Sequence, residues 1–477
     1  MNLLFDSLRA YTNNKIGRRE FLKRAAAAGL TTPAVIAFLQ GCTPASVSQN
    51  SGSDTPKVDL SKFSKDQATA NPLVFNAWNY LPEVVAGFQR EFESQFSESV
   101  NYEVIPGDYT TIMLNKLVAN SPLDCLYTKA QGTKMLAADW LHDLSDLENI
   151  DEIKKATLPS QWAAQSYQGK IFGLPYFNSM KCCLAYNRIR LKEAGLSESD
   201  LPKTWDEAYD IGRRLKKDGF LEHAIVMRWA PNSDALLDNF IAECLSRGDK
   251  LWDEQFNAVF DENTAVGKTL DAWQKIWKDG LVPPDSLGAG DQKQLFGTGD
   301  PLFTCTQSYE LKDLNDPSSG ALAGNVMMVP YNGQPWGFLD YGLYSITKRP
   351  KEDAQRLERR KRWVSFMGYK DKNGSYRVAK EWVKQANLGT GYAEIYSDPE
   401  VIDAYKSWMP EYPKLREIMS ENEKHVQICN GWHAVWYPEW AVKAVDVIPK
   451  VITGDMGVSE GIRVMRDEWD LQQKRYS

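Results

Sequence analysis

The sequence has few of the residues from which metal and redox sites are built. It contains four histidines, no two of which are separated by three residues, and its seven cysteines include no Cys-x-x-Cys pair. These spacings disfavour a zinc site and a dithiol redox centre. Neither the Gly-x-x-x-x-Gly-Lys nor the Gly-x-Gly-x-x-Gly phosphate-binding sequence is present, which disfavours a nucleotide site. We therefore expect no metal and no cofactor.

An excess of positive charge is also missing. The 477 residues carry a net charge of -7, whereas nucleic acids and anionic membranes bind clustered basic faces. The strongest basic run, Arg356 to Arg362, is interrupted by Glu358. Its helical spacing predicts that it lies on the solvated face of a helix. We therefore expect no nucleic-acid partner.

The N-terminal apolar run is too short to span a bilayer. It extends from Ala25 to Leu39 and contains Pro33, whereas a membrane-spanning helix needs roughly 20 apolar residues. Arg18 and Arg19 precede it, and Cys42 follows it closely. This order of basic, apolar and small residues is typical of an export signal, and the paired arginines indicate the twin-arginine route.

Cys42 ends the sequence Leu39-Gln-Gly-Cys42 and resembles the lipid-attachment cysteine of bacterial lipoproteins. The alternative is a buried core cysteine after a cleaved signal. We predict that residues 1–42 are the signal and that residues 43–70, which have few large apolar side chains, are a disordered tether. These features predict a periplasmic protein anchored to the membrane by lipid on Cys42.

Six further cysteines remain, an even number in an oxidising compartment. We expect most of them to be buried free thiols, and one disulfide stays open. They are Cys125, Cys182, Cys183, Cys244, Cys305 and Cys429.

From Pro72 onward, short apolar strands alternate with amphipathic segments. Residues 73–75 predict a strand, Asn76 to Tyr80 a turn, and Pro82 the start of a helix. A strand near 100–105, a helix over 110–119 and a buried strand over 123–127 follow. Further helices are predicted from the Thr204 to Glu207 capping box to Gly219 and over 264–280. This alternation indicates an α/β fold with helices on the faces of a sheet.

A set of motifs then gives a resemblance that covers about Pro72 to Ile462. Its most recognisable block is Gln168-Gly-Lys-Ile-Phe-Gly-Leu-Pro-Tyr176, followed by Leu184-Ala-Tyr-Asn-Arg188 and Pro202-Lys-Thr-Trp-Asp-Glu207. In this order and spacing, the chain resembles family 1 of the extracellular solute-binding proteins of ABC importers, the group that includes maltose-binding proteins.

The resemblance implies an α/β, two-lobe periplasmic binding protein fold of type II, with discontinuous lobes, hinge strands and a ligand cleft between the lobes. By motif position, residues 71–185 and 326–370 form lobe I. Residues 186–325 and 371–477 form lobe II. Closure of such lobes on a ligand requires a higher affinity for the closed state.

The resemblance also implies a set of ligand-binding residues in the loops that face the cleft. Sugar binding uses aromatic faces together with polar side chains that pair with hydroxyl groups. The candidates are Trp78, Asn79, Tyr80, Lys129, Gln131, Tyr176, Asn178, Trp229, Asn232, Gln307, Tyr309, Trp336, Trp432 and Trp436.

Aromatic residues can equally pack in a core, and the local sequence distinguishes the two cases. Trp273, Trp277 and Trp363 have helical spacing and apolar neighbours, which predicts core packing. Glycine, proline or polar residues flank Trp78, Tyr309 and Trp336, for which we expect ligand contact. The first loop lacks the Asp-Lys pair of maltose-binding relatives, which disfavours maltodextrin as the ligand.

We therefore predict a monomeric binding protein that delivers a carbohydrate to an ABC permease. One alternative keeps the fold but binds a polyamine, a glycerol phosphate or an acidic oligosaccharide. A second alternative is a periplasmic enzyme acting on polysaccharides. Gly457-Val-Ser-Glu-Gly461 fits a nucleophile-elbow pattern, but no histidine follows Ser459 to act as its base. We expect no catalysis.

Overall fold

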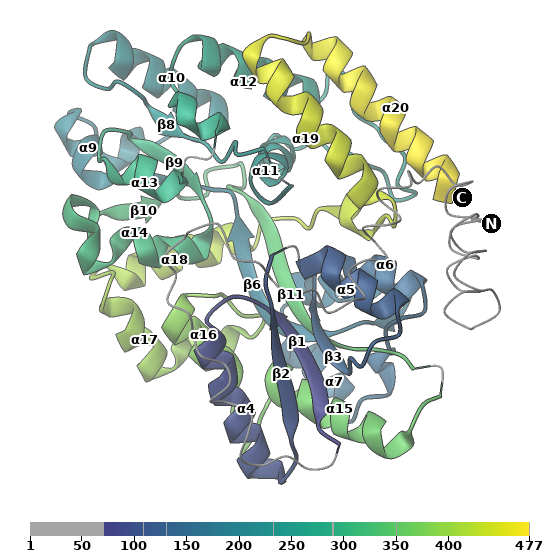
Figure 1. Cartoon of the computed structure of the whole chain (residues 1–477). Helices are drawn as coiled ribbons and strands as arrows, with labels where there is room; N and C mark the ends of the chain where they lie inside the picture. Colours follow the sequence, from purple (N-terminus) through teal and green to yellow (C-terminus); the bar gives the residue numbers. More distant parts are fainter. Residues whose placement is uncertain are drawn as a thin grey trace, which may run out of the picture.

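The computed structural model describes residues 71–107, 109–129, 131–231, 233–288, 291–349 and 351–476 (Figure 1). The predicted signal with Arg18 and Arg19, the tether, Cys42 and the candidate Asn232 lie outside the described residues. Within the described part, no helix is both long and apolar enough to cross a membrane.

Two separate sheets organise the described chain. The first has the order β2-β1-β3-β11-β6, and the second has the order β10-β7-β9-β8. In the first sheet, β1 is parallel to β2 and β3, while β11 is antiparallel to β3 and β6. Their bounds are β1 Leu73–Trp78, β2 Val100–Ile105, β3 Cys125–Thr128, β6 Leu174–Lys181 and β11 Phe338–Ile346 in the first sheet, and β7 Cys183–Asn187, β8 Ile225–Val226, β9 Phe303–Thr306 and β10 Val326–Met328 in the second. A short pair, β4 Ser166–Tyr167 and β5 Lys170–Ile171, completes the strands.

Helices surround the two sheets (Figure 1). On the first sheet, α15 packs against β11 and β6, and α4 packs against β2. Around the second sheet, α13 contacts β8, and α14 and α18 contact β10. The helices up to residue 217 are α4 Pro82–Phe96, α5 Tyr109–Val118, α6 Gln131–Ala137, α7 Ile150–Ala156, α8 Pro159–Ala164, α9 Arg188–Glu193 and α10 Trp205–Lys217. Those that follow are α11 Asp238–Ser246, α12 Ala265–Lys278, α13 Gln292–Gly297, α14 Leu311–Asn315, α15 Ala354–Gly368, α16 Arg377–Ala386, α17 Pro399–Lys406, α18 Tyr412–Glu423, α19 Tyr437–Thr453 and α20 Val458–Tyr476.

The chain passes directly from one sheet to the other at Cys182. This residue separates β6 from β7 and has a φ of 58°, so β6 and β7 do not form one continuous strand. Cys182 and Cys183 are both buried, as are the other four cysteines of the described part, and all six are free thiols. Burial of these thiols confirms the expectation of free core cysteines.

The first strands and helices follow the predicted alternation closely. Helix α4 begins at Pro82 and buries Val85, Phe88 and Phe92. Strand β1 continues to Trp78, whereas the sequence predicted a turn from Asn76. The strand is longer because Asn76 pairs with β2 and β3, and its buried side chain donates to Glu103. The predicted helices over 110–119 and 264–280 correspond to α5 and α12.

The capping box before α10 is only half formed. Thr204 accepts a hydrogen bond from the Glu207 backbone N–H at 3.2 Å, as the sequence predicts. The Glu207 carboxylate instead accepts from the backbone N–H of Lys203 at 2.8 Å. The helix therefore begins where expected, although the reciprocal bond goes to the residue before the cap.

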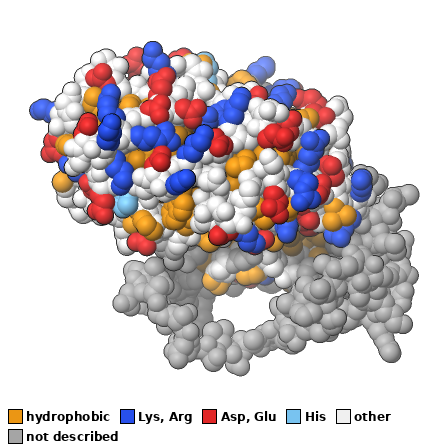
Figure 2. Space-filling view, turned by 90° about the horizontal axis from the view of Figure 1, so that it is seen from above, with side chains coloured by type: hydrophobic (Ala, Val, Ile, Leu, Met, Phe, Trp, Pro, Cys, Tyr) orange, Lys and Arg blue, Asp and Glu red, His pale blue; other side chains and the backbone are white. Residues whose placement is uncertain are grey.

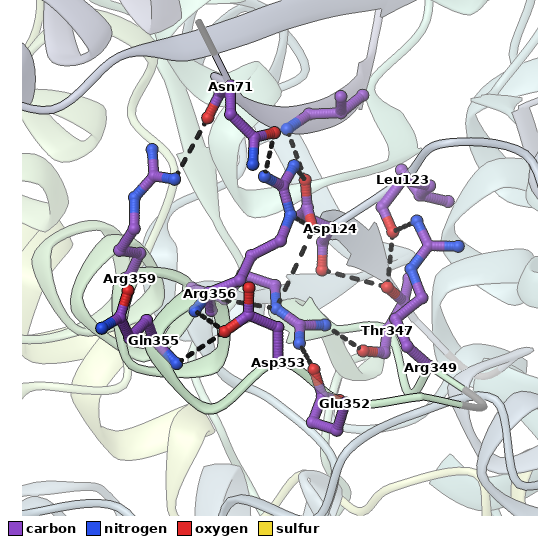
Figure 3. A network of polar contacts seen from close by, with 12 residues as sticks. Asn71, Leu123, Asp124, Thr347, Arg349, Glu352, Asp353, Gln355, Arg356 and Arg359 are labelled. Carbon is purple, nitrogen blue, oxygen red and sulfur yellow. Dashed lines mark hydrogen bonds and ion pairs between the residues drawn. The ribbon is translucent and has the colours of Figure 1, made fainter. Parts of the chain in front are cut away.

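The basic run on α15 does not lie entirely on a solvated face. Arg356 donates to both carboxylate oxygens of Asp124, at 2.9 and 2.6 Å, and Arg360 lies 3.9 Å from the same carboxylate (Figure 3). Arg360 is fully buried and also donates to the Thr347 carbonyl at 2.7 Å. The prediction was wrong for these two arginines, because a buried carboxylate at the end of the first sheet needs cations to compensate its charge.

One face of the molecule shows no segregation of charge. On the face seen from above in Figure 1, where α10, α12 and α20 lie, basic and acidic side chains are interspersed (Figure 2). That face therefore lacks the clustered positive potential that binds nucleic acid.

The predicted lobe boundaries can be set beside the two sheets. Residues 326–328, assigned by sequence to lobe I, pair with β7 in the second sheet. Helix α16, from a segment assigned to lobe II, contacts β6, and its Trp382 packs 5.2 Å from Tyr176. The division into lobes at the stated residues stays a prediction.

Candidate ligand-binding site

A pocket of about 730 Å³ lies where the carboxyl ends of β1, β2 and β3 meet α11 and α19. Its volume falls within the range of about 300–1,000 Å³ that is usual for small-molecule sites, and the carboxyl ends of parallel strands are a preferred position for them. The lining residues are Trp78, Gly107, Tyr109, Thr110, Thr111, Lys129, Gln131, Lys181, Asp238, Asp340, Trp432, Tyr437, Pro438, Ala441, Val442 and Val445.

Trp78, the last residue of β1, is one aromatic wall of the pocket. Its ring lies 5.3 Å from that of Tyr109 and 4.7 Å from that of Tyr127. The Lys129 ammonium lies 5.7 Å from the Trp78 ring centroid, within the range of a cation–π contact. These neighbours fix the orientation of an aromatic side chain that is only partly buried.

Trp432 is the second tryptophan of the pocket and comes from the opposite half of the chain. It lies in the short 3-10 helix Asn430–His433 and packs 5.3 Å from Phe338 and 5.8 Å from Tyr341. The next residue, His433, hydrogen-bonds to Thr133 on α6 at 3.2 Å. This contact ties the segment that carries Trp432 to the first turn of α6.

Four charged side chains form the floor of the pocket. Lys129 follows β3, Lys181 ends β6, Asp340 lies near the start of β11, and Asp238 begins α11. Asp340 Oδ2 lies 3.2 Å from Lys129 Nζ and 3.7 Å from Lys181 Nζ, and Lys181 forms a close ion pair with Asp238. We name these four residues the floor cluster.

Close approach of strands β6 and β11 positions the floor cluster. Phe338 pairs with Lys181 across β11 and β6. Gly337, directly before β11, has a φ of 88°, and a side chain there would collide with the Lys181 carbonyl. Glycine therefore lets β11 start against Lys181, which brings Asp340 within reach of both lysines.

One wall of the pocket is apolar. Pro438, Val442 and Val445 are spaced by four and three residues on α19, so they lie on one face of that helix. Val442 is 75% exposed. Thr110 and Thr111 of α5 add hydroxyl groups to the lining. The pocket therefore combines aromatic, aliphatic and charged surfaces.

The pocket brings together four of the candidates expected from sequence, namely Trp78, Lys129, Gln131 and Trp432. Sequence reasoning missed Lys181, Asp238 and Asp340. A signal was available for two of them, because Lys181 and Asp340 are charged residues within strands whose other positions are buried. Asp238 gave no such signal, since it lies within a helix.

Several other candidates are not among the lining residues. Tyr176 stacks on Tyr127 at 4.4 Å and supports Trp78 at 5.6 Å. Asn178 is buried in β6, and Asn79 follows Trp78 on the chain. Tyr80 stacks on Trp382 at 6.2 Å, and burial raises the pKa of its phenol to about 12.

Two candidates lie at the short 3-10 helix Ser308–Glu310, which follows β9. Gln307 is buried and precedes Ser308–Glu310. Burial is the main cause of the raised pKa of the Tyr309 phenol; the Glu310 and Asp340 carboxylates also raise this pKa, and Lys181 lowers it. Neither residue is part of the pocket lining.

The remaining tryptophan candidates are packed among other aromatic rings. Trp336 is fully buried, lies 5.4 Å from Trp205, and donates its indole N–H to the Pro330 carbonyl at 2.9 Å. Trp229 is also fully buried and lies 5.1 Å from Trp273. Trp436 packs 5.7 Å from Trp469. We expected Trp336 to contact a ligand, but its ring is packed in the core. Its flanking proline and glycine belong to a loop that surrounds this buried ring.

The described residues offer no cluster of three or more His, Cys, Asp or Glu side chains able to hold a metal ion. The pocket instead presents ammonium donors and carboxylate acceptors beside aromatic faces. Such groups can bind and orient a ligand by hydrogen bonding and stacking.

Comparison with known proteins agrees with this architecture. Residues 90–359 match the family model of bacterial extracellular solute-binding proteins. Comparison with curated proteins gives no match.

Solved structures share the fold at low sequence identity. Maltose-bound MalE3 of T. maritima is 18% identical, with a TM-score of 0.67 over 84% of this chain and 99% of that one. The GacH receptor of Streptomyces glaucescens is 17% identical, with a TM-score of 0.67 over 85% and 99%. Lmo0181 of Listeria monocytogenes, in complex with cycloalternan, is 15% identical, with a TM-score of 0.65 over 85% and 98%. The chain belongs to the bacterial extracellular solute-binding proteins and has their two-lobe α/β fold.

Proposed function

We propose that the protein binds a carbohydrate in the pocket between Trp78 and Trp432 and delivers it to an ABC permease. The observation that carries this proposal is the composition of the pocket, in which two tryptophans and the floor cluster share one lining. Aromatic rings stack on the C–H faces of sugar rings, while charged groups pair with sugar hydroxyls. The similar structures include proteins solved with maltose, cycloalternan and D-mannitol, which supports a sugar or polyol as ligand.

Delivery follows from closure of the two lobes around the ligand. The floor cluster combines Lys129, Lys181 and Asp340, which lie in or next to strands of the first sheet, with Asp238 of α11. A ligand seated on it therefore contacts both the first sheet and α11. A ligand that binds such a site better when the lobes are closed shifts the population toward the closed form. We propose that the permease recognises that form, and that the protein works as a monomer without catalysis.

Thermal unfolding of the full chain against a panel of saccharides tests the carbohydrate assignment. A ligand at a hundred times its dissociation constant stabilises a folded protein by about 2.7 kcal/mol, which raises the melting temperature measurably. Stabilisation by at least one sugar or polyol is the expected result. Stabilisation by polyamines or glycerol phosphate alone would refute the carbohydrate assignment and leave the fold unaffected.

We also propose that the protein is exported by the twin-arginine route and anchored by lipid on Cys42 in the periplasm. Cys42→Ala should move the exported protein from the membrane fraction to the soluble fraction of the cell, because the residue that would carry the acyl chains is missing. Fractionation followed by immunoblotting measures this. Retention of the variant in the membrane fraction would argue for another anchor, and Cys125→Ala controls for loss of a cysteine.

A further inference from the structure

The floor cluster has a charge balance that bears on which ligands the pocket accepts. We infer that the pocket selects an uncharged, hydroxyl-rich ligand, and that Asp340 is the residue that determines this selectivity. The inference rests on the proposed carbohydrate function and narrows it, because that function alone would also admit acidic and amino sugars.

The four charges alternate in sign along the floor. Lys129 contacts Asp340, Asp340 contacts Lys181, and Lys181 contacts Asp238. Two lysines and two aspartates give no net formal charge. No other charged side chain is present among the lining residues that the structure describes. The part of the lining that the structure describes therefore has no excess of either sign with which to attract an ion.

Because these side chains are buried, their charge balance restricts which ligands can bind. The side chains of Lys181, Asp238 and Asp340 are 4, 4 and 3% exposed, whereas Lys129 is 29% exposed. An incoming carboxylate or phosphate would have to share the lysines with Asp340, which places like charges together at low dielectric. An incoming ammonium group would compete with the lysines for the aspartates in the same way. A neutral ligand breaks none of these three ion pairs.

Asp340 still has hydrogen-bonding capacity after its ion pairs are formed. Its Oδ2 faces both lysines, but its buried Oδ1 has no hydrogen-bond partner among the described residues. A buried acceptor without a donor is costly, and a ligand hydroxyl that donates to it removes the cost. Hydroxyl groups can donate to Oδ1 and also accept from the partly exposed Lys129 ammonium, whereas a carboxylate can only accept.

Calorimetric titration of the full chain with matched sugars tests the inference. The probes are two sets of sugars in which one position carries a neutral hydroxyl-bearing group or a charged group: D-glucose with D-glucuronate and D-glucosamine, and D-galactose with its uronate and amine. Maltose, D-mannitol and D-tagatose extend the neutral set. We expect the wild-type chain to bind a neutral probe at least tenfold more tightly than any uronate or amine tested.

Asp340→Asn should then shift the ratio of uronate to neutral affinity by at least tenfold toward the uronate, because both lysines lose a counter-charge. Asp313→Asn removes an exposed carboxylate that pairs with Lys293 and should leave the ratio unchanged. Lys129→Gln, at the most exposed position of the cluster, should shift selectivity in the opposite direction, toward the amines. It therefore also tests the inference if Asp340→Asn does not fold.

The outcomes separate this inference from the function on which it rests. Tighter binding of a uronate or an amine by the wild-type chain would overturn the inference while the carbohydrate function stands. Unchanged selectivity in both Asp340→Asn and Lys129→Gln would do the same. Failure of every sugar and polyol to bind would overturn the carbohydrate function and the inference with it.

Discussion

Asp124 and Asp340 are both buried carboxylates, and they lie at opposite ends of the paired strands β3 and β11. Asp124 accepts hydrogen bonds on both oxygens, from Arg356 and from the Val74 backbone N–H (Figure 3). Asp340 pairs with two lysines through one oxygen, while the other oxygen has no partner among the described residues. A fully satisfied carboxylate stabilises the fold, whereas a partly satisfied one at a pocket floor is available to a ligand.

The largest expected effect is on the satisfied cluster. Asp124→Ala removes the partner of Arg356 and the carboxylate 3.9 Å from fully buried Arg360, which keeps its ion pair with Glu352. Breaking a buried ion pair in this way costs about 3–5 kcal/mol, so we expect a loss of that size in the free energy of unfolding. Chemical denaturation measures it.

Asp313→Asn is the matched control for Asp124→Ala, because it breaks an exposed ion pair with Lys293. Exposed pairs are worth about 0–1 kcal/mol. An equal, small effect of the two substitutions would show that the Asp124 cluster does not stabilise the fold.

Trp336→Ala should have a comparable effect on stability. The side chain is fully buried against Trp205, and truncation of a buried aromatic residue costs about 3–5 kcal/mol. We expect a large decrease in the melting temperature, with the sugar affinity of the folded fraction retained. Loss of sugar binding without loss of stability would instead support the ligand contact that the sequence predicts.

Trp78→Ala should show the opposite pattern. Its ring lines the pocket and is partly exposed, so we expect sugar affinity to fall at least tenfold, or about 1.4 kcal/mol. Titration calorimetry measures the affinity, and Trp78→Phe, which keeps an aromatic face, should recover part of it. Wild-type affinity in Trp78→Ala would remove this residue from the site.

The smallest effect concerns pH. Burial lowers the pKa of the His433 imidazole below 6.5, so at low pH the unfolded chain binds a proton at this position that the folded chain does not. The free energy of unfolding should therefore fall as the pH drops below about 6.5 and should not depend on His433 above it. The same direction holds for His142, whose pKa is lowered mainly by burial.

His433→Gln should flatten this dependence. Denaturant unfolding at pH 7.5, 6.5 and 5.5 measures the slope for the wild type and the variant. His425→Gln removes a partly exposed histidine two residues beyond α18 and serves as the control. Identical slopes for His433→Gln and the wild type would contradict the assignment.

The sequence predicts the fold well because local patterns determine much of it. Pro82 and the spacing of Val85, Phe88 and Phe92 define α4, and the apolar runs define β2 and β3 within two residues. The sequence predicts the site less well, since Lys181, Asp238 and Asp340 come together only through the packing of β6, β11 and α11. For Trp336 the sequence favoured ligand contact, whereas the side chain is fully buried. Polar or glycine neighbours along the chain do not reveal what surrounds a ring in space.

A crystal structure of the chain with the saccharide that stabilises it most would test the account most directly. The account predicts a sugar ring against Trp78 and a hydroxyl within hydrogen-bonding distance of Asp340 Oδ1. A saccharide bound elsewhere, with the floor cluster unchanged and without contact to the ligand, would contradict it.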